Sequence, residues 1–201
     1  MDAPAAFSIV ESQARPFGHL VALALPQAPH HIPEDVWAQL LGDEGEVART
    51  LGGHRRAEWI GGRLALRAAA RALGLEVGAI LPGVRNQPVL PPEVSASISH
   101  KRALVVALVG RASEGTLGVD LEELLPERLG VAKHVLRPEE LEELEGLPAG
   151  AQWAYLRDRF SIKEALYKAL FPTLQRYVGF HEAALQLTPD GYQVAWHLDQ
   201  G

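Results

Sequence analysis

The chain has 201 residues, a formal net charge of −6 and no cysteine, and 47% of its residues are hydrophobic. This length accommodates one sizeable domain or two small ones that share a core. The lack of cysteine excludes disulfides, thiolate nucleophiles and thiolate metal sites, so any bound metal must have oxygen or imidazole ligands. No apolar run approaches the about 18 residues that span a bilayer, and the N-terminus lacks a basic region followed by an apolar one, so we expect a cytoplasmic protein.

Hydrophobic periodicity and turn residues predict, in chain order, a β-hairpin, a short helix, a long helix, a Pro- and Gly-rich loop and three strands. The expected ranges are Phe7–Val10 and Leu20–Leu25 for the hairpin, Glu34–Leu41 and Glu46–Leu73 for the helices, and Ser95–Ser99, Ala103–Val109 and Thr116–Glu122 for the strands. The pair Gly52-Gly53 is expected to interrupt the long helix, because glycine is a weak helix former. Along that helix, arginines recur beside an apolar stripe, so one face is expected to be core and the next cationic; they are Arg56, Arg63, Arg67 and Arg71.

The C-terminal part is predicted to form helical pieces, a long helix and a second hairpin. The ranges are Arg128–Val135, Pro138–Leu147 and Ala151–Phe171 for the helices, and Ala183–Leu187 and Tyr192–His197 for the hairpin. The acidic stretch PEELEELEGL from Pro138 is interpreted as a solvated face, because it lacks the spacing of a closed metal cage. Each half contributes strands and one long helix, which indicates an α+β fold with halves at 1–110 and 111–201.

Basic residues gather in the middle of the chain. Between His54 and Arg111 there are nine Lys and Arg against three acids. A basic region in an acidic chain favours a polyanionic ligand over nucleic acid, because duplex-binding domains usually carry net positive charge. Arginines that only solvate a helix would produce the same count.

Three short motifs carry groups suited to phosphate and metal chemistry. In SISH, Ser99, His100 and Lys101 supply successive donors for a phosphate at a strand end, although a histidine there is also common without a ligand role. In GVDLE, a strand would place Asp120 and Glu122 on one face, which suits Mg²⁺ or an ordinary wet surface.

The third motif is FSIKEALYKAL, Phe160–Leu170, in which Glu164 and Lys168 lie four residues apart on one helix face. They form either a surface ion pair or a metal ligand beside a phosphate-facing cation. If Glu164 faces the carboxylates of GVDLE, three acids meet in an oxygen-only site for Mg²⁺, with Mn²⁺ as a substitute. The chain has no GxxxxGK[ST] loop and no GxGxxG after a strand, so it is not a recognised nucleotide triphosphate fold.

In this order, SISH, GVDLE and FSIKEALYK closely resemble the motifs of 4′-phosphopantetheinyl transferases of the surfactin type. The longer pattern HRRAEWIGGR…QPVLP…SISHK resembles the subgroup associated with enterobactin synthetase, a siderophore system of secondary metabolism. The resemblance runs from about His54 to Phe180. It implies a monomeric pseudo-dimer of two similar halves with the active site in the cleft between them, the N-terminal half contacting the coenzyme adenosine and the C-terminal half carrying metal ligands and the catalytic helix.

The resemblance also implies that coenzyme A is the co-substrate, that Mg²⁺ bridges its pyrophosphate, and that a serine of an apo acyl or peptidyl carrier protein receives the phosphopantetheine arm. The products are the holo-carrier protein and adenosine 3′,5′-bisphosphate, and neither nucleic acid nor membrane is a partner. The matching metal ligands are Asp120, Glu122 and Glu164, and the matching coenzyme contacts are Arg55, Arg56, Arg63, Gln87, Pro88, Ser99, His100, Lys163 and Lys168. Serine is a weak nucleophile, so a carboxylate is expected to accept its proton, with Glu164 favoured over Glu122, while Lys168 stabilises phosphate charge.

One departure and two alternatives stay open. Many surfactin-type members have Gly-Lys-Pro where this chain has Asn86-Gln87-Pro88, so the lysine contact is lost or made by Arg85. A noncatalytic carrier-binding module of the same fold is disfavoured by the intact acids, because clustered carboxylates without metal cost stability. A Mg²⁺-dependent phosphohydrolase is disfavoured by the missing nucleotide loop and the missing His-Asp metal clusters.

Overall fold

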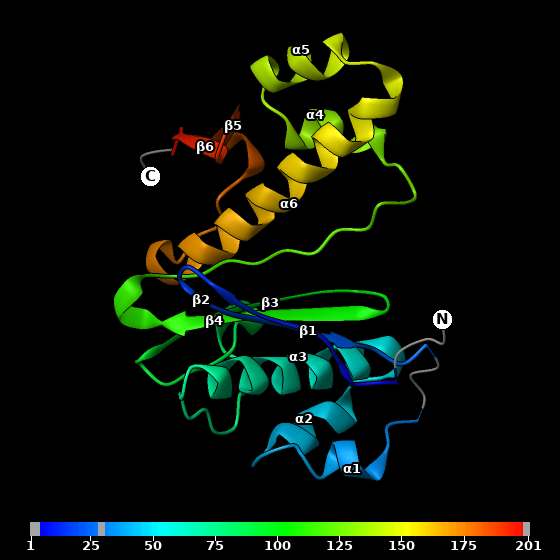
Figure 1. Ribbon diagram of the computed structural model, residues 1–201, viewed down its shortest axis with the longest axis vertical. Helices are drawn as coiled ribbons and strands as arrows, with labels where there is room; N and C mark the ends of the chain where they lie inside the picture. Colours follow the sequence, from blue (N-terminus) through cyan, green and yellow to red (C-terminus); the bar gives the residue numbers. More distant parts are fainter. Residues whose placement is uncertain (1–4, 28–30, 199–201) are drawn as a thin grey trace. The chain divides into compact units, whose positions relative to one another are not determined.

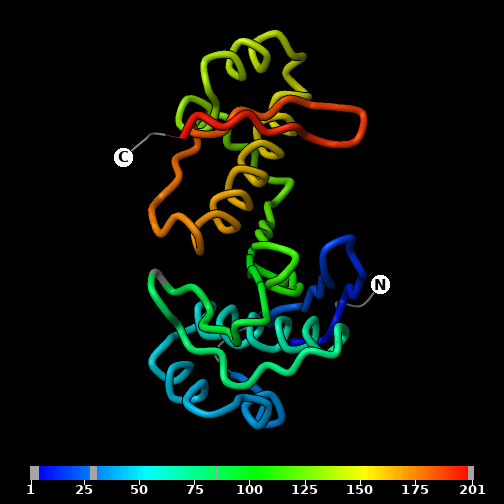
Figure 2. The backbone as a smooth tube through the Cα atoms, turned by 90° about the vertical axis from the view of Figure 1, so that its left-hand side faces the viewer, coloured from blue at the N-terminus to red at the C-terminus, as the bar shows by residue number. Residues whose placement is uncertain are grey.

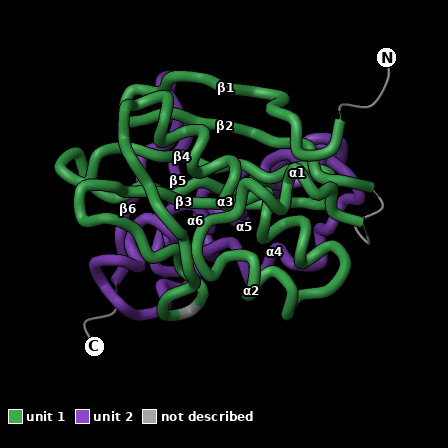
Figure 3. Tube along the Cα trace, turned by 90° about the horizontal axis from the view of Figure 1, so that it is seen from below, with its two compact units in different colours: residues 1–121 green, residues 122–201 purple. Residues whose placement is uncertain are grey.

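The computed structural model describes residues 5–27 and 31–198 (Figure 1). The chain divides into two compact units, Met1–Leu121 and Glu122–Gly201, which Figure 3 shows in two colours. Both units combine helices with antiparallel strands, which confirms the predicted mixture of helix and sheet. The boundary lies after Leu121, whereas the sequence suggested residue 110. Among the described residues, no helix is both long enough and apolar enough to cross a bilayer.

Unit 1 contains a four-stranded antiparallel sheet in the order β1-β2-β4-β3. The strands are β1 (Ile9–Arg15), β2 (Gly18–Ala24), β3 (Val94–Lys101) and β4 (Leu104–Arg111). The predicted first strand, Phe7–Val10, overlaps β1 only at Ile9 and Val10, because β1 continues to Arg15 through an exposed polar stretch that carries no apolar signal. Pairing with β2 defines the strand instead, and Arg15 opposite Gly18 leaves a two-residue loop.

Three helices follow the first hairpin: α1 (Glu34–Trp37), α2 (Glu44–Thr50) and α3 (Gly53–Ala72). The predicted interruption at Gly52-Gly53 is confirmed, and Gly53 has a φ of 50°, in the region that favours glycine. Helix α3 packs across one face of the sheet, and at Gly61 a Cβ would lie 2.7 Å from Leu25 Cδ2. The absence of that Cβ therefore allows close approach of helix and sheet.

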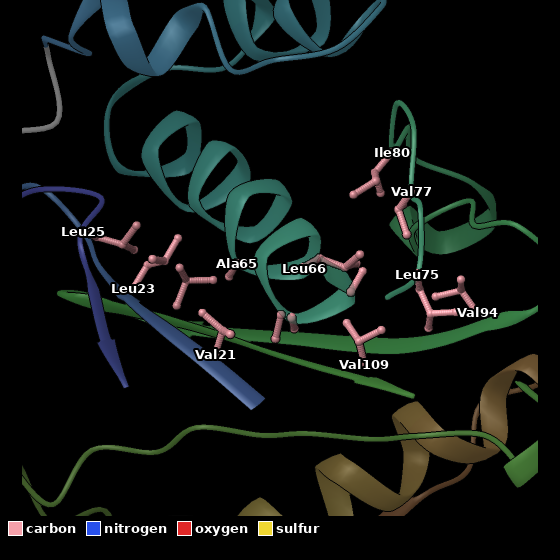
Figure 4. Packing of buried hydrophobic residues seen from close by; sticks show 14 residues of the cluster. Val21, Leu23, Leu25, Ala65, Leu66, Leu75, Val77, Ile80, Val94 and Val109 are labelled. Carbon is pink, nitrogen blue, oxygen red and sulfur yellow. The ribbon is translucent and has the colours of Figure 1, made fainter. Parts of the chain in front are cut away.

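Figure 4 shows the buried core between α3 and the sheet. Leu66 of α3 meets Val21 and Leu23 of β2 and Val109 of β4, all at most 2% exposed. The loop after α3 adds Leu75, Val77 and Ile80 to the same cluster and contains the 3-10 turn η1 (Val84–Asn86). Burial of this continuous apolar surface positions β3, whose C-terminal half carries the SISH motif.

The segment after β4 is not a strand, so the predicted strand Thr116–Glu122 is wrong. After the 3-10 turn η2 (Ala112–Glu114), the backbone amides of residues 117, 119 and 121 donate hydrogen bonds to serine side chains of β3. These bonds tie residues 117–121 to unit 1, which explains why the unit boundary follows Leu121.

Unit 2 is built on the helix α6 (Ala149–Leu174), preceded by η3 (Leu129–Val131), α4 (Ala132–Val135) and α5 (Pro138–Gly146). Trp153 and Leu156 of α6 pack with buried apolar residues of α4 and α5. The helix passes Pro172, where the sequence predicted its end, and stops at Leu174 before Gln175 with a φ of 53°. Proline lacks the N–H that would bond to the carbonyl of Lys168, so α6 loses one intrahelical hydrogen bond close to its end.

The predicted second hairpin is confirmed as β5 (Ala183–Thr188) and β6 (Gly191–Trp196), drawn in orange to red in Figure 2, after the 3-10 turn η4 (Phe180–Glu182). Unit 2 thus has a two-stranded sheet where unit 1 has four strands. That the two halves are structurally similar, with the active site in a cleft between them, stays a prediction.

Candidate active site

Asp120 of the GVDLE motif is held by the SISH strand. Ser99 Oγ donates to Asp120 Oδ1 at 2.9 Å and accepts the Leu121 amide at 3.2 Å. Ser97 accepts the Val119 amide and Ser95 the Leu117 amide, each at 3.1 Å. Two predicted motifs, 21 residues apart, therefore meet within unit 1.

His100 points to the opposite face of β3 from Ser99, as alternation along a strand requires. Its Nδ1 lies 3.3 Å from Glu58 Oε1 of α3, and 37% of the His100 side chain is exposed. The predicted contact of His100 with a coenzyme phosphate stays a prediction.

The predicted cationic face of α3 is only partly correct. Arg55 is exposed, and Arg56 is half-buried with Nε donating to the backbone oxygens of Ala48 and Leu51. Arg63 and Arg67 are only 7% and 4% exposed, so the prediction of a solvent-facing cationic surface is wrong for these two.

Both buried arginines have partners inside unit 1. Arg67 Nη1 donates to both carboxylate oxygens of the fully buried Glu44, at 2.6 and 2.9 Å. Glu44 was not identified as a partner from the sequence. Arg63 stacks 3.8 Å from the ring centroid of Trp59, and its Nε donates to Ile80 O. Burial lowers the pKa of Arg63 to about 10, although the negative charge of Glu44 acts to raise it. The guanidinium therefore stays protonated at neutral pH.

The loop that departs from the family pattern has a defined backbone. Gly83 N donates to Gln87 O at 2.7 Å, and Pro88 forms an isolated bridge with Pro82. Gln87 and Pro88 are both half-buried. The side chain of Arg85 lies outside the described residues, so the alternative that it replaces the family lysine stays open.

Glu164 and Lys168 lie one turn apart on α6, and both are half-buried. Burial raises the pKa of Tyr177, and the negative charge of Glu164 adds to the increase. Glu164 is thus close enough to Tyr177 to influence its phenol, whose ring lies 5.1 Å from that of Tyr167. The third motif therefore presents a carboxylate, an ammonium and the Tyr167 phenol on α6, and Tyr177 from the following segment lies against Tyr167.

Lys163 occupies the interior of unit 2. Its Nζ donates to Glu140 Oε2 at 2.5 Å and to Val135 O at 3.0 Å, and its side chain is 1% exposed. This placement opposes the predicted coenzyme contact of Lys163, because the ammonium is engaged inside the protein.

Glu140 corrects the interpretation of PEELEELEGL as a wholly solvated face. It is 2% exposed and also accepts the amides of Arg137 at 2.9 Å and Leu185 at 3.0 Å, while Arg159 Nε lies 3.8 Å from it. The other acids of α5, Glu139, Glu142, Glu143 and Glu145, are exposed as predicted. A single glutamate thus links α5, α6 and β5.

In the part of the chain that the structure describes, no group of three or more His, Asp or Glu side chains could hold a metal ion. Asp120 belongs to unit 1, whereas Glu122 and Glu164 belong to unit 2, so the predicted ligand set draws on both units. The donors themselves suit the predicted ion, because hard cations such as Mg²⁺ prefer carboxylate oxygens. The three-carboxylate site stays a prediction.

Known proteins and family models match this chain along most of its length. A model described as the 4′-phosphopantetheinyl transferase N-terminal domain matches residues 44–110, and one described as the 4′-phosphopantetheinyl transferase superfamily matches residues 116–200. The 4′-phosphopantetheinyl transferase Svp of Streptomyces mobaraensis is 37% identical over 163 residues, which cover 79% of this chain and 65% of Svp.

Two further relatives show the same relationship. The 4′-phosphopantetheinyl transferase Npt of Nocardia iowensis is 34% identical over 75% of this chain and 67% of Npt. Enterobactin synthase component D of Escherichia coli O157:H7 is 36% identical over 59% of this chain and 56% of that protein. The chain thus spans about two thirds or less of the length of these relatives.

Proposed function

Because the chain belongs to the 4′-phosphopantetheinyl transferase superfamily, we propose that it transfers the 4′-phosphopantetheine arm of coenzyme A to a serine of an apo carrier protein. The observation that carries the proposal is the match to both family models in succession, with GVDLE and FSIKEALYK inside the second. Relatives named as transferases, together with a component of enterobactin synthase, make a carrier protein the expected acceptor. The proposed products are the holo-carrier protein and adenosine 3′,5′-bisphosphate.

Asp120, Glu122 and Glu164 are the proposed ligands of Mg²⁺, with Mn²⁺ as a substitute. When bound, the ion would neutralise charge on the pyrophosphate of coenzyme A. Ser99 keeps one oxygen of Asp120 oriented through the 2.9 Å hydrogen bond, so this ligand is held in place before any ion arrives. Pre-orientation of a carboxylate reduces the entropy lost on binding.

The proposed reaction is an in-line displacement at the β-phosphorus of coenzyme A. The hydroxyl oxygen of the carrier serine forms the new phosphorus–oxygen bond while the bond to the bridging oxygen of the pyrophosphate breaks, and adenosine 3′,5′-bisphosphate leaves with that oxygen. Glu164 is the proposed acceptor of the serine proton, with Glu122 as the second candidate. Lys168, one turn along α6 from Glu164, is proposed to stabilise charge on the leaving phosphate.

Solvent exposure divides the predicted coenzyme contacts into accessible residues and buried residues. Arg55, Arg56 and His100 retain exposed surface and are the proposed contacts of the 3′-phosphate and neighbouring phosphates. Arg63 and Lys163 are buried with partners inside their own units, and we assign both a primarily structural role. Gln87 and Pro88 remain proposed contacts because both keep part of their surface exposed.

Incubation of the chain with coenzyme A, Mg²⁺ and an apo carrier protein tests the proposal by mass spectrometry of the carrier. Transfer increases the carrier mass by one phosphopantetheine arm. A carrier that binds without changing mass would favour the noncatalytic module, and cleavage of coenzyme A without transfer would favour a phosphohydrolase. A panel of acyl and peptidyl carriers would then identify the acceptor by relative rate.

A further inference from the structure

Three serines of β3 hold a segment that is not itself a strand. Ser95, Ser97 and Ser99 alternate along the strand, so their side chains lie on one face, opposite the α3 face to which Ile98 contributes. Their hydroxyl oxygens accept the amides of residues 117, 119 and 121 at 3.1, 3.1 and 3.2 Å. The period of two on both sides shows that an extended segment follows β3 in register through side chains rather than through backbone oxygens.

The hydrogen-bond roles at Ser99 follow from the chemistry of its partners. A backbone N–H only donates, so the Ser99 oxygen must accept from Leu121. The hydroxyl proton is then available for the Asp120 carboxylate, whose Oδ1 lies 2.9 Å away. Ser99 is 6% exposed, so water competes poorly with both bonds.

We propose that Ser95, Ser97 and Ser99 form a hydroxyl ladder that sets the register of residues 117–121, and that Ser99 is the positioning residue for the Asp120 carboxylate. The proposal rests on the proposed function in that Asp120 is a metal ligand. It changes the role expected for Ser99 from a direct phosphate contact to a residue that acts through Asp120. A shift of one residue in this register would turn the carboxylate to the other side of the segment.

Ser97 provides a matched control for Ser99. Both are buried to the same 6% exposure, both lie on the same face of β3, and each accepts one amide, but the bond to Asp120 is made by Ser99. Ser97→Ala therefore removes a rung of the ladder and leaves the carboxylate contact, whereas Ser99→Ala removes both. Ser99→Thr keeps the hydroxyl and tests for rescue.

The first measurement is hydrogen exchange of the full chain without ligands, resolved to single amides by NMR. Ser97→Ala should speed exchange of the Val119 amide and Ser99→Ala that of the Leu121 amide, each by about three- to tenfold, the loss expected from one hydrogen bond. Ser99→Thr should restore the native rate. Unchanged exchange in both alanine variants would overturn the ladder.

The second measurement is Mn²⁺ binding in the presence of coenzyme A, followed through the electron paramagnetic resonance signal of unbound Mn²⁺. Ser99→Ala should weaken Mn²⁺ binding by about tenfold, because a hydrogen bond to a charged group is lost, and Ser97→Ala by less than about twofold. Equal weakening in the two variants would overturn the positioning role. A higher KM for coenzyme A in Ser99→Ala with native Mn²⁺ binding would show instead that Ser99 is a phosphate ligand.

These readouts separate the inference from the proposed function. If no variant or native chain transfers the arm, but the exchange and Mn²⁺ results are as expected, the proposed function fails and the ladder stands. If Ser99→Ala does not fold, Ser99→Cys replaces it, since a thiol retains the shape but is a weak donor and acceptor. Native transfer activity together with native Mn²⁺ binding in that variant would overturn the inference alone.

Discussion

Lys163 offers the sharpest test of the structure against the family pattern. The pattern places it among the coenzyme contacts, whereas its ammonium lies 2.5 Å from Glu140 Oε2 inside unit 2. We therefore predict that Lys163→Met lowers the stability of the chain. Methionine has a similar length and no charge, so the change isolates the ion pair from the packing of the side chain.

The expected loss of unfolding free energy depends on the contacts that the Glu140 carboxylate retains after the substitution. Removing one partner of a buried ion pair typically costs about 3–5 kcal/mol, because the other charge remains buried. In Lys163→Met, the Glu140 carboxylate still accepts two backbone amides and lies 3.8 Å from Arg159 Nε. These remaining contacts place the expected loss at the lower end, about 3 kcal/mol.

Urea unfolding followed by circular dichroism and tryptophan fluorescence measures this loss. With a slope of about 2 kcal/mol per M, the midpoint should fall by about 1.5 M. Lys133→Met, at an exposed position of α4 in the same unit, is the control and should change stability by less than about 0.5 kcal/mol. If Lys163→Met keeps native stability while the KM for coenzyme A rises about tenfold, Lys163 contacts the ligand and is not a buried structural residue.

Three further predictions concern the proposed active site. Asp120→Asn and Glu164→Gln should each abolish transfer while circular dichroism and the urea midpoint remain near native; unchanged turnover in either variant would contradict the three-carboxylate site. Lys168→Ala should lower kcat more than it raises the KM for coenzyme A, because its charge acts on the reacting phosphate; steady-state kinetics with unchanged kcat and a raised KM would make it a binding group. Arg55→Ala should raise the KM for coenzyme A with native stability, whereas Arg63→Met should lower the urea midpoint through loss of the Trp59 stack and the Ile80 bond. A raised KM for coenzyme A and native stability in Arg63→Met, with a native KM in Arg55→Ala, would show that Arg63 and not Arg55 contacts the phosphate.

Local sequence was sufficient wherever neighbouring residues determine the conformation. Apolar alternation predicted β3, a continuous apolar run predicted β4, and the glycine pair predicted the break between α2 and α3, because strand and helix formation depend largely on nearby side chains. The three motifs, in their order, were sufficient to predict the family that the comparisons show. Their residue types and spacing suit phosphate and metal chemistry whatever their exact environment.

The tertiary structure decided which charged groups reach solvent. Arg67 and Lys163 look like surface cations in the sequence, but each is buried by a glutamate 23 residues away, Glu44 and Glu140 respectively. Burial of a charge depends on whether a partner from another element compensates its desolvation, and no local pattern records that partner.

The GVDLE segment shows the same division within one motif. The sequence was sufficient to mark Asp120 as a candidate metal ligand and to suggest an extended backbone. It did not show that the amides of this segment bond to serine hydroxyls of β3, because a serine in a strand has the same local signal whether its side chain faces water or another backbone. The residue types mark Asp120 as a candidate ligand, and the distant backbone amides that require acceptors decide where its carboxylate is held.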